Sequence, residues 1–141
     1  MTDTTAAAPA VAVPNTTGLL RAALKLDAVV TGANGAAYLA AAGPLEDLLG
    51  LDPTLLRGIG AFLLAFAAVV WVTGSRPEIA RPAVRGIVAA NVAWAAGSVA
   101  AAIGGLGSPE AAGTVWIVLQ AIVVGGFAEL QLMGLKRAAA R

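Results

Sequence analysis

The sequence predicts an all-α membrane protein, a bundle of four transmembrane helices with both termini in the cytoplasm. Of its 141 residues, 59% are hydrophobic and only 12% are charged, whereas soluble domains have about 25% charged residues. Four apolar segments of about 20 or more residues, enough to cross a hydrocarbon layer of about 30 Å, alternate with short loops that contain proline or glycine. Basic residues gather at one set of segment ends, and this asymmetry predicts the orientation.

The N-terminal stretch, residues 1–17, is rich in alanine, threonine and proline. We expect it to be a disordered tail, followed by a single membrane domain over residues 18–141. The first span is expected over residues 19–43. The letters "YLAAAG" near its end also resemble a signal-peptide cleavage site, but Asp27 and Asn34 interrupt the apolar run. This interruption favours a retained transmembrane helix.

The loops contain residues that begin and end helices. The segment "GPLEDLLGLDP" is expected to form a short amphipathic turn at the membrane interface. Asp52 can cap the second span, with Pro53 at its first helical position. Ser108 can cap the fourth span in the same way. The three remaining spans are expected over residues 53–73, 82–104 and 111–135.

Eight of the nine basic residues lie at the same set of span ends. The exception is Arg57, near loops that otherwise carry acidic residues. The positive-inside rule therefore predicts a multi-pass protein of the cell membrane with both termini in the cytoplasm. The eight residues are Arg21, Lys25, Arg76, Arg81, Arg85, Lys136, Arg137 and Arg141.

The composition excludes several kinds of chemistry. The chain has no cysteine and no histidine, so disulfides, thiol chemistry and the commonest metal ligands are absent. We therefore expect no metal and no cofactor. The net charge of +1 offers no basic stripe for nucleic acid. The only available nucleophile–base pairing is serine or threonine with Lys25, so we expect no enzymatic activity.

Three polar residues are expected at one depth in the membrane. Asp27, Asn91 and Glu129 each lie six or seven residues inward from a basic residue of their own span, which is about 9–10 Å along a helix. Ionisable groups inside a membrane are candidates for function. Arg85 is the candidate partner for the Asp27 carboxylate. The four residues form the predicted polar layer.

The first span also carries a polar face that begins at Asp27. In the fourth span Gln120 and Gln131 share a face, but Glu129 lies nearly opposite Gln120. Either Glu129 reaches the cytoplasmic surface, or Gln120 faces a partner chain. The polar face of the first span continues at Thr31, Asn34 and Tyr38.

Small residues recur at every fourth position of the first and third spans, and such ridges let helices approach closely. In both spans an arginine also precedes a polar residue by six positions. This pattern indicates either a duplicated helix pair or a chance match between alanine-rich helices. The candidate packing residues are Gly32, Ala36, Ala93 and Gly97.

The stretches "LRAALKLDAVVTGANGAAYLAAAGPLEDLLGL" and "GTVWIVLQAIVVGGFAELQ" resemble small uncharacterised four-helix integral membrane proteins of actinobacteria. In architecture the chain is also similar to DoxX-like membrane proteins, although it has no diagnostic DoxX residues. The resemblance implies a four-helix inner-membrane protein and no assigned reaction or catalytic residue.

Three functions remain open. The leading hypothesis is a non-enzymatic structural or assembly subunit in contact with the lipid bilayer, forming a homo-oligomer or joining a larger membrane complex through its small-residue faces. The alternative is a transporter, channel or sensor for a proton, cation or small solute that uses the polar layer. A DoxX-like redox accessory protein is the third. The polar layer itself is either a cavity or a set of interhelical hydrogen bonds.

Overall fold

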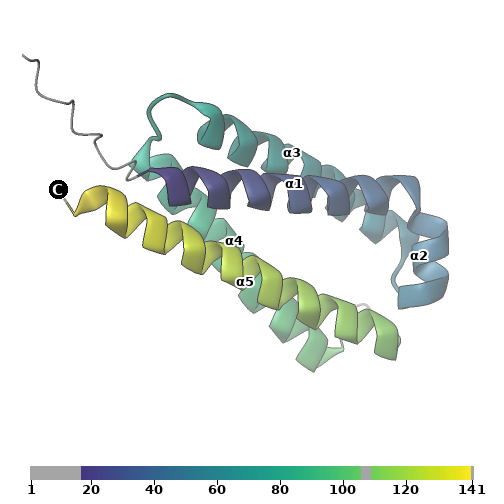
Figure 1. The fold of residues 1–141 in the computed structure, drawn as a ribbon. Coiled ribbons are helices and arrows are strands. Elements are labelled where there is room, and N and C mark those ends of the chain that lie inside the picture. Colours follow the sequence, from purple (N-terminus) through teal and green to yellow (C-terminus); the bar gives the residue numbers. More distant parts are fainter. Residues whose placement is uncertain (1–16, 106–108, 141) are drawn as a thin grey trace, which may run out of the picture.

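The computed structural model describes residues 17–105 and 109–140, and all regular structure within these ranges is helical. The predicted tail, apart from Thr17, and the predicted cap Ser108 lie outside the described residues. Figure 1 shows the arrangement of the helices. In chain order they are α1 (Gly18–Ala40), α2 (Ala42–Leu49), α3 (Pro53–Ser75), α4 (Arg81–Gly104) and α5 (Ala111–Ala139).

Three of these helices, α3, α4 and α5, are long and apolar enough to cross a membrane, which indicates a multi-pass membrane protein. The sequence predicted four spans, the first of them now seen as α1. Although α1 has 23 residues, it does not qualify by the same measure, because its charged and polar residues lower its mean hydropathy. A fourth span is therefore a proposal.

The helix ends follow from local sequence. The Asp52 carboxylate accepts a hydrogen bond from the Leu55 backbone N–H at 2.9 Å, and Pro53 is the first residue of α3, so the predicted cap is confirmed. The expected interfacial turn is the eight-residue helix α2. Gly50, with φ 67°, ends α2 in a left-handed conformation that glycine adopts readily. The Leu49 carbonyl then accepts a hydrogen bond from the Glu110 N–H at 3.1 Å, which ties α2 to the start of α5.

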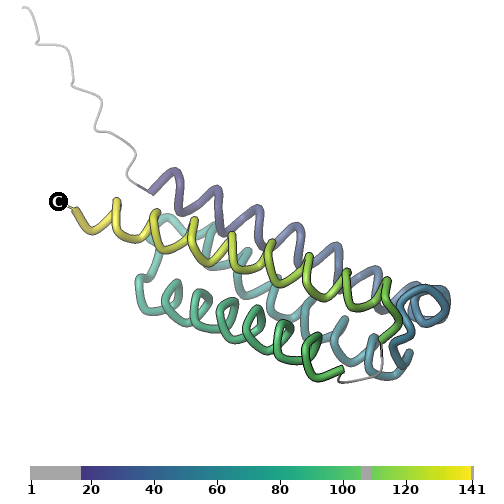
Figure 2. The backbone as a smooth tube through the Cα atoms, turned by 90° about the horizontal axis from the view of Figure 1, so that it is seen from below, coloured from purple at the N-terminus to yellow at the C-terminus, as the bar shows by residue number. Residues whose placement is uncertain are grey.

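The four long helices form two pairs, α1 with α3 and α4 with α5 (Figures 1 and 2). The pairs lie close together where α1 begins and α5 ends, which we call the terminal end. There a Cβ added to Gly134 would lie 2.8 Å from the Leu20 Cα. Toward the other end the pairs diverge, and α2 covers the wide end (Figure 1).

Two apolar cores hold this wedge together. The core at the terminal end joins all four long helices and includes Leu24, Val70, Val84 and Ala128. The second core lies around α2 and includes Leu49, Leu56 and Leu63. The two cores lie at opposite ends of the wedge. Neither core therefore fills the middle of the interface between the two helix pairs.

A close helix crossing joins Gly35 of α1 to Gly60 of α3. A Cβ added to Gly35 would lie 2.8 Å from the Gly60 carbonyl oxygen, and one added to Gly60 would lie 2.8 Å from the Gly35 carbonyl oxygen. Both glycines are buried. The two backbones therefore meet without intervening side chains, as small residues permit in membrane helices.

This crossing corrects the predicted packing ridge. Of the candidates, Gly32 packs beside Ala67, but Ala36 and Ala93 are exposed, and a Cβ on Gly97 would meet open space. The reason is geometric: residues four apart advance about 40° around a helix at each step, because a turn takes about 3.6 residues. After two or three steps, the next residue of such a ridge therefore no longer points at the neighbouring helix.

Arg21 closes the C-terminal end of α3. Its guanidinium donates to the carbonyl oxygens of Gly74 at 2.6 Å, Arg76 at 2.8 Å and Pro77 at 3.2 Å. We expect Arg21→Met to lower the free energy of unfolding by about 1–3 kcal/mol, because charged hydrogen bonds to otherwise unpaired carbonyls are lost. Thermal unfolding in detergent, followed by circular dichroism, measures the change.

Arg57 provides the matched control for this experiment. It is exposed on α3 and makes no hydrogen bond within the described part of the chain. We expect Arg57→Met to change the unfolding temperature little. Equal unfolding temperatures for the two variants would show that the Arg21 contacts do not stabilise the fold.

Candidate functional site

A buried carboxylate lies between the two helix pairs. Asp27 is 0% exposed. Its Oδ1 accepts a hydrogen bond from the Thr31 hydroxyl at 2.9 Å. Its Oδ2 accepts from the Asn91 amide at 2.8 Å and from the Gln131 amide at 2.7 Å. These four residues, the Asp27 cluster, connect α1 with α4 and α5.

The sequence builds this cluster by placing polar residues within buried stripes. Asp27 and Thr31 are one turn apart on α1. Asn91 continues the buried stripe of α4 that contains Val84, Ile87 and Val88. Gln131 similarly lies among the buried residues near the end of α5. Each polar side chain therefore points into the bundle, where its partners are on other helices.

The donors to Asp27 are all neutral. In the described part of the chain Asp27 forms no ion pair, and its hydrogen bonds are the three above. Asn91 also donates to the Gln131 carbonyl oxygen at 3.3 Å. Among the described residues, no buried polar side-chain atom lacks a partner. The cluster thus satisfies a carboxylate that accepts at both oxygens, as buried polar groups require.

The structure brings together only part of the predicted polar layer. Asn91 contacts Asp27, but Arg85 and Glu129 are exposed and do not join the cluster. Glu129 lines a groove on the outer face of α4 and α5. The number of residues between a polar residue and the basic end of its helix predicts how deep that residue lies in the membrane. It does not predict which side of the helix the side chain is on, so it could not show that Glu129 points outward. Gln131, two residues further along α5, points inward instead.

Gln120 and Glu129 lie on nearly opposite faces of α5, so only one of them can point into the bundle. Gln120 hydrogen-bonds to Tyr38 of α1 within this chain, so Glu129 is the residue that reaches the surface. Gln131 was absent from the predicted layer, although its shared face with Gln120 was a usable signal. Eleven residues are close to three helical turns, so both side chains face the same way.

Between the Asp27 cluster and α2, the diverging pairs enclose a cleft of about 870 Å³. All four long helices line it, and its volume is in the range of about 300–1,000 Å³ typical of small-molecule sites. Thr31 and Asn91 belong to both the cluster and the cleft wall. The cleft is therefore continuous with the buried carboxylate's own hydrogen-bond partners.

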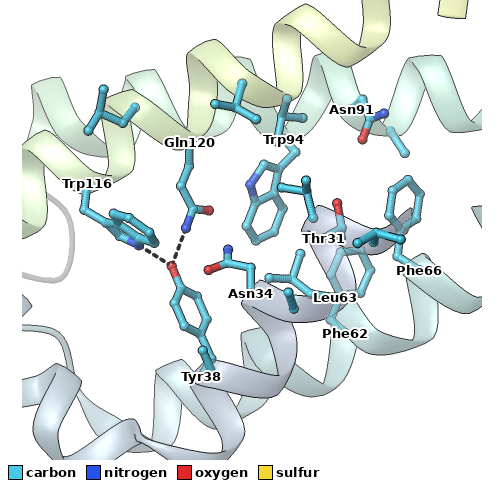
Figure 3. Close-up of a pocket in the computed structure, with 18 of the residues that line it drawn as sticks. Thr31, Asn34, Tyr38, Phe62, Leu63, Phe66, Asn91, Trp94, Trp116 and Gln120 are labelled. Atoms are coloured by element: carbon cyan, nitrogen blue, oxygen red, sulfur yellow. Dashed lines mark hydrogen bonds between the residues drawn. The ribbon is translucent and has the colours of Figure 1, made fainter. Parts of the chain in front are cut away.

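Aromatic rings form one wall of the cleft (Figure 3). Phe62 of α3 stacks on Trp94 of α4, with ring centroids 5.9 Å apart and an angle of 16° between the planes. Phe66, one turn further along α3, also stacks on Phe62, with ring centroids 6.2 Å apart. The Phe62–Trp94 pair therefore bridges α3 and α4 with apolar rings.

The polar groups of the cleft come from its other side. The Tyr38 hydroxyl accepts hydrogen bonds from the Trp116 indole N–H at 2.8 Å and from the Gln120 amide at 2.9 Å. Asn34 also points into the cleft (Figure 3). It makes no hydrogen bond within the described part of the chain. The predicted polar face of the first span therefore divides: Asp27 and Thr31 belong to the cluster, and Asn34 and Tyr38 face the cleft.

Comparison with known protein families, with curated proteins and with solved structures finds no match. The similarity to actinobacterial and DoxX-like membrane proteins therefore stays an expectation from sequence. A function for this chain has to be inferred from the Asp27 cluster and the cleft.

Proposed function

We propose that the protein is a four-span protein of the cell membrane that binds a small lipophilic molecule in its cleft and does not catalyse a reaction. The observation that carries this proposal is the cleft of about 870 Å³ between the helix pairs, with apolar walls and a few convergent polar groups. This combination is the usual form of a small-molecule site. The absence of histidine and cysteine from the sequence supports binding over catalysis.

The burial pattern of α1 supports its role as the fourth span. Its most polar residues, Asp27 and Thr31, are buried against other helices. The side chains that it exposes are apolar and include Leu26 and Leu39, which lie outside the cleft. A helix whose polar groups are satisfied inside the bundle can face lipid with the remainder.

The distribution of charge supports a cytoplasmic location for both termini. The start of α1 and the end of α5 lie at the same end of the bundle (Figure 1), near most of the basic residues. There Lys25 Nζ lies 5.3 Å from the ring centroid of Trp71. Lysine and tryptophan together are typical of the membrane interface.

We expect a substitution that fills the cleft to abolish binding. Ala93 lines the cleft, so the ring of Ala93→Phe competes with a ligand for the same space, and affinity falls by about tenfold or more. The probe is 4-nonylphenol with one bromine on the ring, added to the protein in phosphatidylcholine nanodiscs. Bromine quenches tryptophan fluorescence at short range. In a Trp71→Phe background the remaining tryptophans, Trp94 and Trp116, both line the cleft.

Ala96→Phe is the matched control, because Ala96 lies on the same helix but lines the outer groove of α4 and α5. We expect saturable quenching in this variant as in the parent protein. Quenching that rises linearly with probe in the parent would indicate partition into lipid alone and would contradict the proposal. Equal saturable affinity in both phenylalanine variants would place the probe outside the cleft.

A second candidate function is the transport or sensing of a proton or cation at Asp27. It is favoured by one observation, a fully buried carboxylate whose described partners are all neutral. A carboxylate in such surroundings is costly unless a proton or a cation compensates it. Assembly into homo-oligomers or larger complexes also stays a proposal, which cross-linking in native membranes tests.

A further inference from the structure

Two polar groups in the cleft are available to a ligand. Asn34 of α1 and Gln120 of α5 reach into the cleft from opposite sides (Figure 3). The Gln120 amide N–H₂ donates to Tyr38, so its carbonyl oxygen stays free within the described part of the chain. Asn34 offers both a donor and an acceptor. Unpaired polar groups in an apolar cleft gain free energy when a ligand group pairs with them.

The electrostatics of the cleft restrict the charge of its ligand. Every side chain that lines the cleft is neutral. The Asp27 carboxylate bonds to two residues of the cleft wall, Thr31 and Asn91, but does not itself line the cleft, and its oxygens are already occupied by three donors. An ionised ligand would lose its hydration without gaining an opposite charge on the wall. A neutral ligand has no such cost.

The shape of the cleft favours a ring. The rings of Phe62 and Trp94, whose planes are 16° apart, line the cleft on the side away from Tyr38 (Figure 3). Planar rings stack on such surfaces in offset geometry. The remaining walls are aliphatic, for example at Leu63, Leu119 and Val123, and suit an apolar chain.

We propose that the ligand is a neutral, hydroxyl-bearing ring with an apolar chain, and that Asn34 and Gln120 recognise its hydroxyl group. The hydroxyl donates to the Gln120 carbonyl oxygen and accepts from the Asn34 amide, so one ligand group pairs with both side chains. The ring packs on the aromatic wall. This inference rests on the proposed binding function of the cleft and adds the chemical class of the ligand.

The experiment compares three probes that differ at one position. They are the ring-brominated 4-nonylphenol, its methyl ether, and an analogue with trimethylammonium in place of the hydroxyl. The methyl ether still accepts a hydrogen bond but has no hydrogen to donate. In the Trp71→Phe background we expect the phenol to bind about tenfold more tightly than the ether, and we expect no saturable binding of the cationic probe.

Substitutions of Gln120 and Asn34 test how each residue recognises the hydroxyl. Gln120→Met keeps the side-chain length and removes the carbonyl oxygen that accepts from the hydroxyl, so we expect phenol affinity to fall to the level of the ether while ether affinity changes less than about twofold. Asn34→Leu conserves approximate volume and removes the amide that donates to both probes, so we expect both affinities to fall by a similar factor and the preference for the phenol to remain. If Gln120→Met does not fold, unchanged affinities in Asn34→Leu would still contradict the proposed contacts.

The possible outcomes separate this inference from the proposed function. If none of the probes binds saturably, the binding function of the cleft is wrong. If phenol and ether bind equally to the parent protein, the cleft binds lipophiles but does not recognise a hydroxyl, and the inference is overturned. Tighter binding of the cationic probe would also overturn it and would point to a cationic ligand near Asp27.

Discussion

Gly35→Leu is expected to prevent α1 from packing on α3 and to cost more than about 4 kcal/mol of unfolding free energy. A Cβ at this position would lie 2.8 Å from the Gly60 carbonyl oxygen and 3.0 Å from the Leu64 backbone N. Backbone atoms within a helix cannot rotate away, so the helices have to separate along their length. Gel filtration in detergent and thermal unfolding measure the loss of folded protein.

The control is Gly58→Leu on α3, two residues before Gly60. A Cβ at Gly58 meets open space, and leucine has a higher helix propensity than glycine. We expect this variant to retain the unfolding temperature of the parent protein or to raise it slightly. If Gly35→Leu unfolds at the same temperature as Gly58→Leu, the close crossing of α1 and α3 does not exist in the folded protein.

The Gly35–Gly60 crossing also shows the limit of the sequence reading of this fold. Helix positions could be predicted, because apolar length and capping residues such as Asp52 are local properties. The face on which α1 meets α3 could not be predicted from ridges spaced by four, since such ridges turn around the helix. The ridge with a spacing of four passes through Ala36, whereas the contact passes through Gly35 on a neighbouring face.

The site was predictable to a similar extent. Depth measured from the basic ends identified Asp27 and Asn91, which the structure joins. The same measure selected Glu129 in place of Gln131, because depth carries no information about rotation around the α5 axis. The cleft had no signal in the sequence. It arises because two separate cores hold the ends of the wedge, a property of tertiary packing alone.

The second large effect is expected at Asp27. Asp27→Leu removes both acceptor oxygens and leaves the amides of Asn91 and Gln131 buried without their partner. Removing one partner from a buried charged hydrogen-bond network costs about 3–5 kcal/mol, and we expect an effect of this size on the unfolding free energy. Glu129→Leu is the matched control, because Glu129 is an exposed carboxylate on α5. Equal stability of the two variants would mean that the cluster does not hold the helix pairs together.

Asp27→Asn separates the geometry of the cluster from its charge. The new amide keeps one acceptor oxygen, and rotation of the Asn91 and Gln131 amides can pair its N–H₂ group, so we expect a loss of only about 1 kcal/mol. If Asp27 is a structural tie between helix pairs, this variant also retains binding of the brominated phenol, since Asp27 does not line the cleft. If Asp27 carries protons or cations, the parent protein conducts them in liposomes and the folded Asp27→Asn variant does not. A folded variant that loses both flux and phenol binding would link the two sites, and Thr31 and Asn91, which belong to both, are the residues through which such coupling would act.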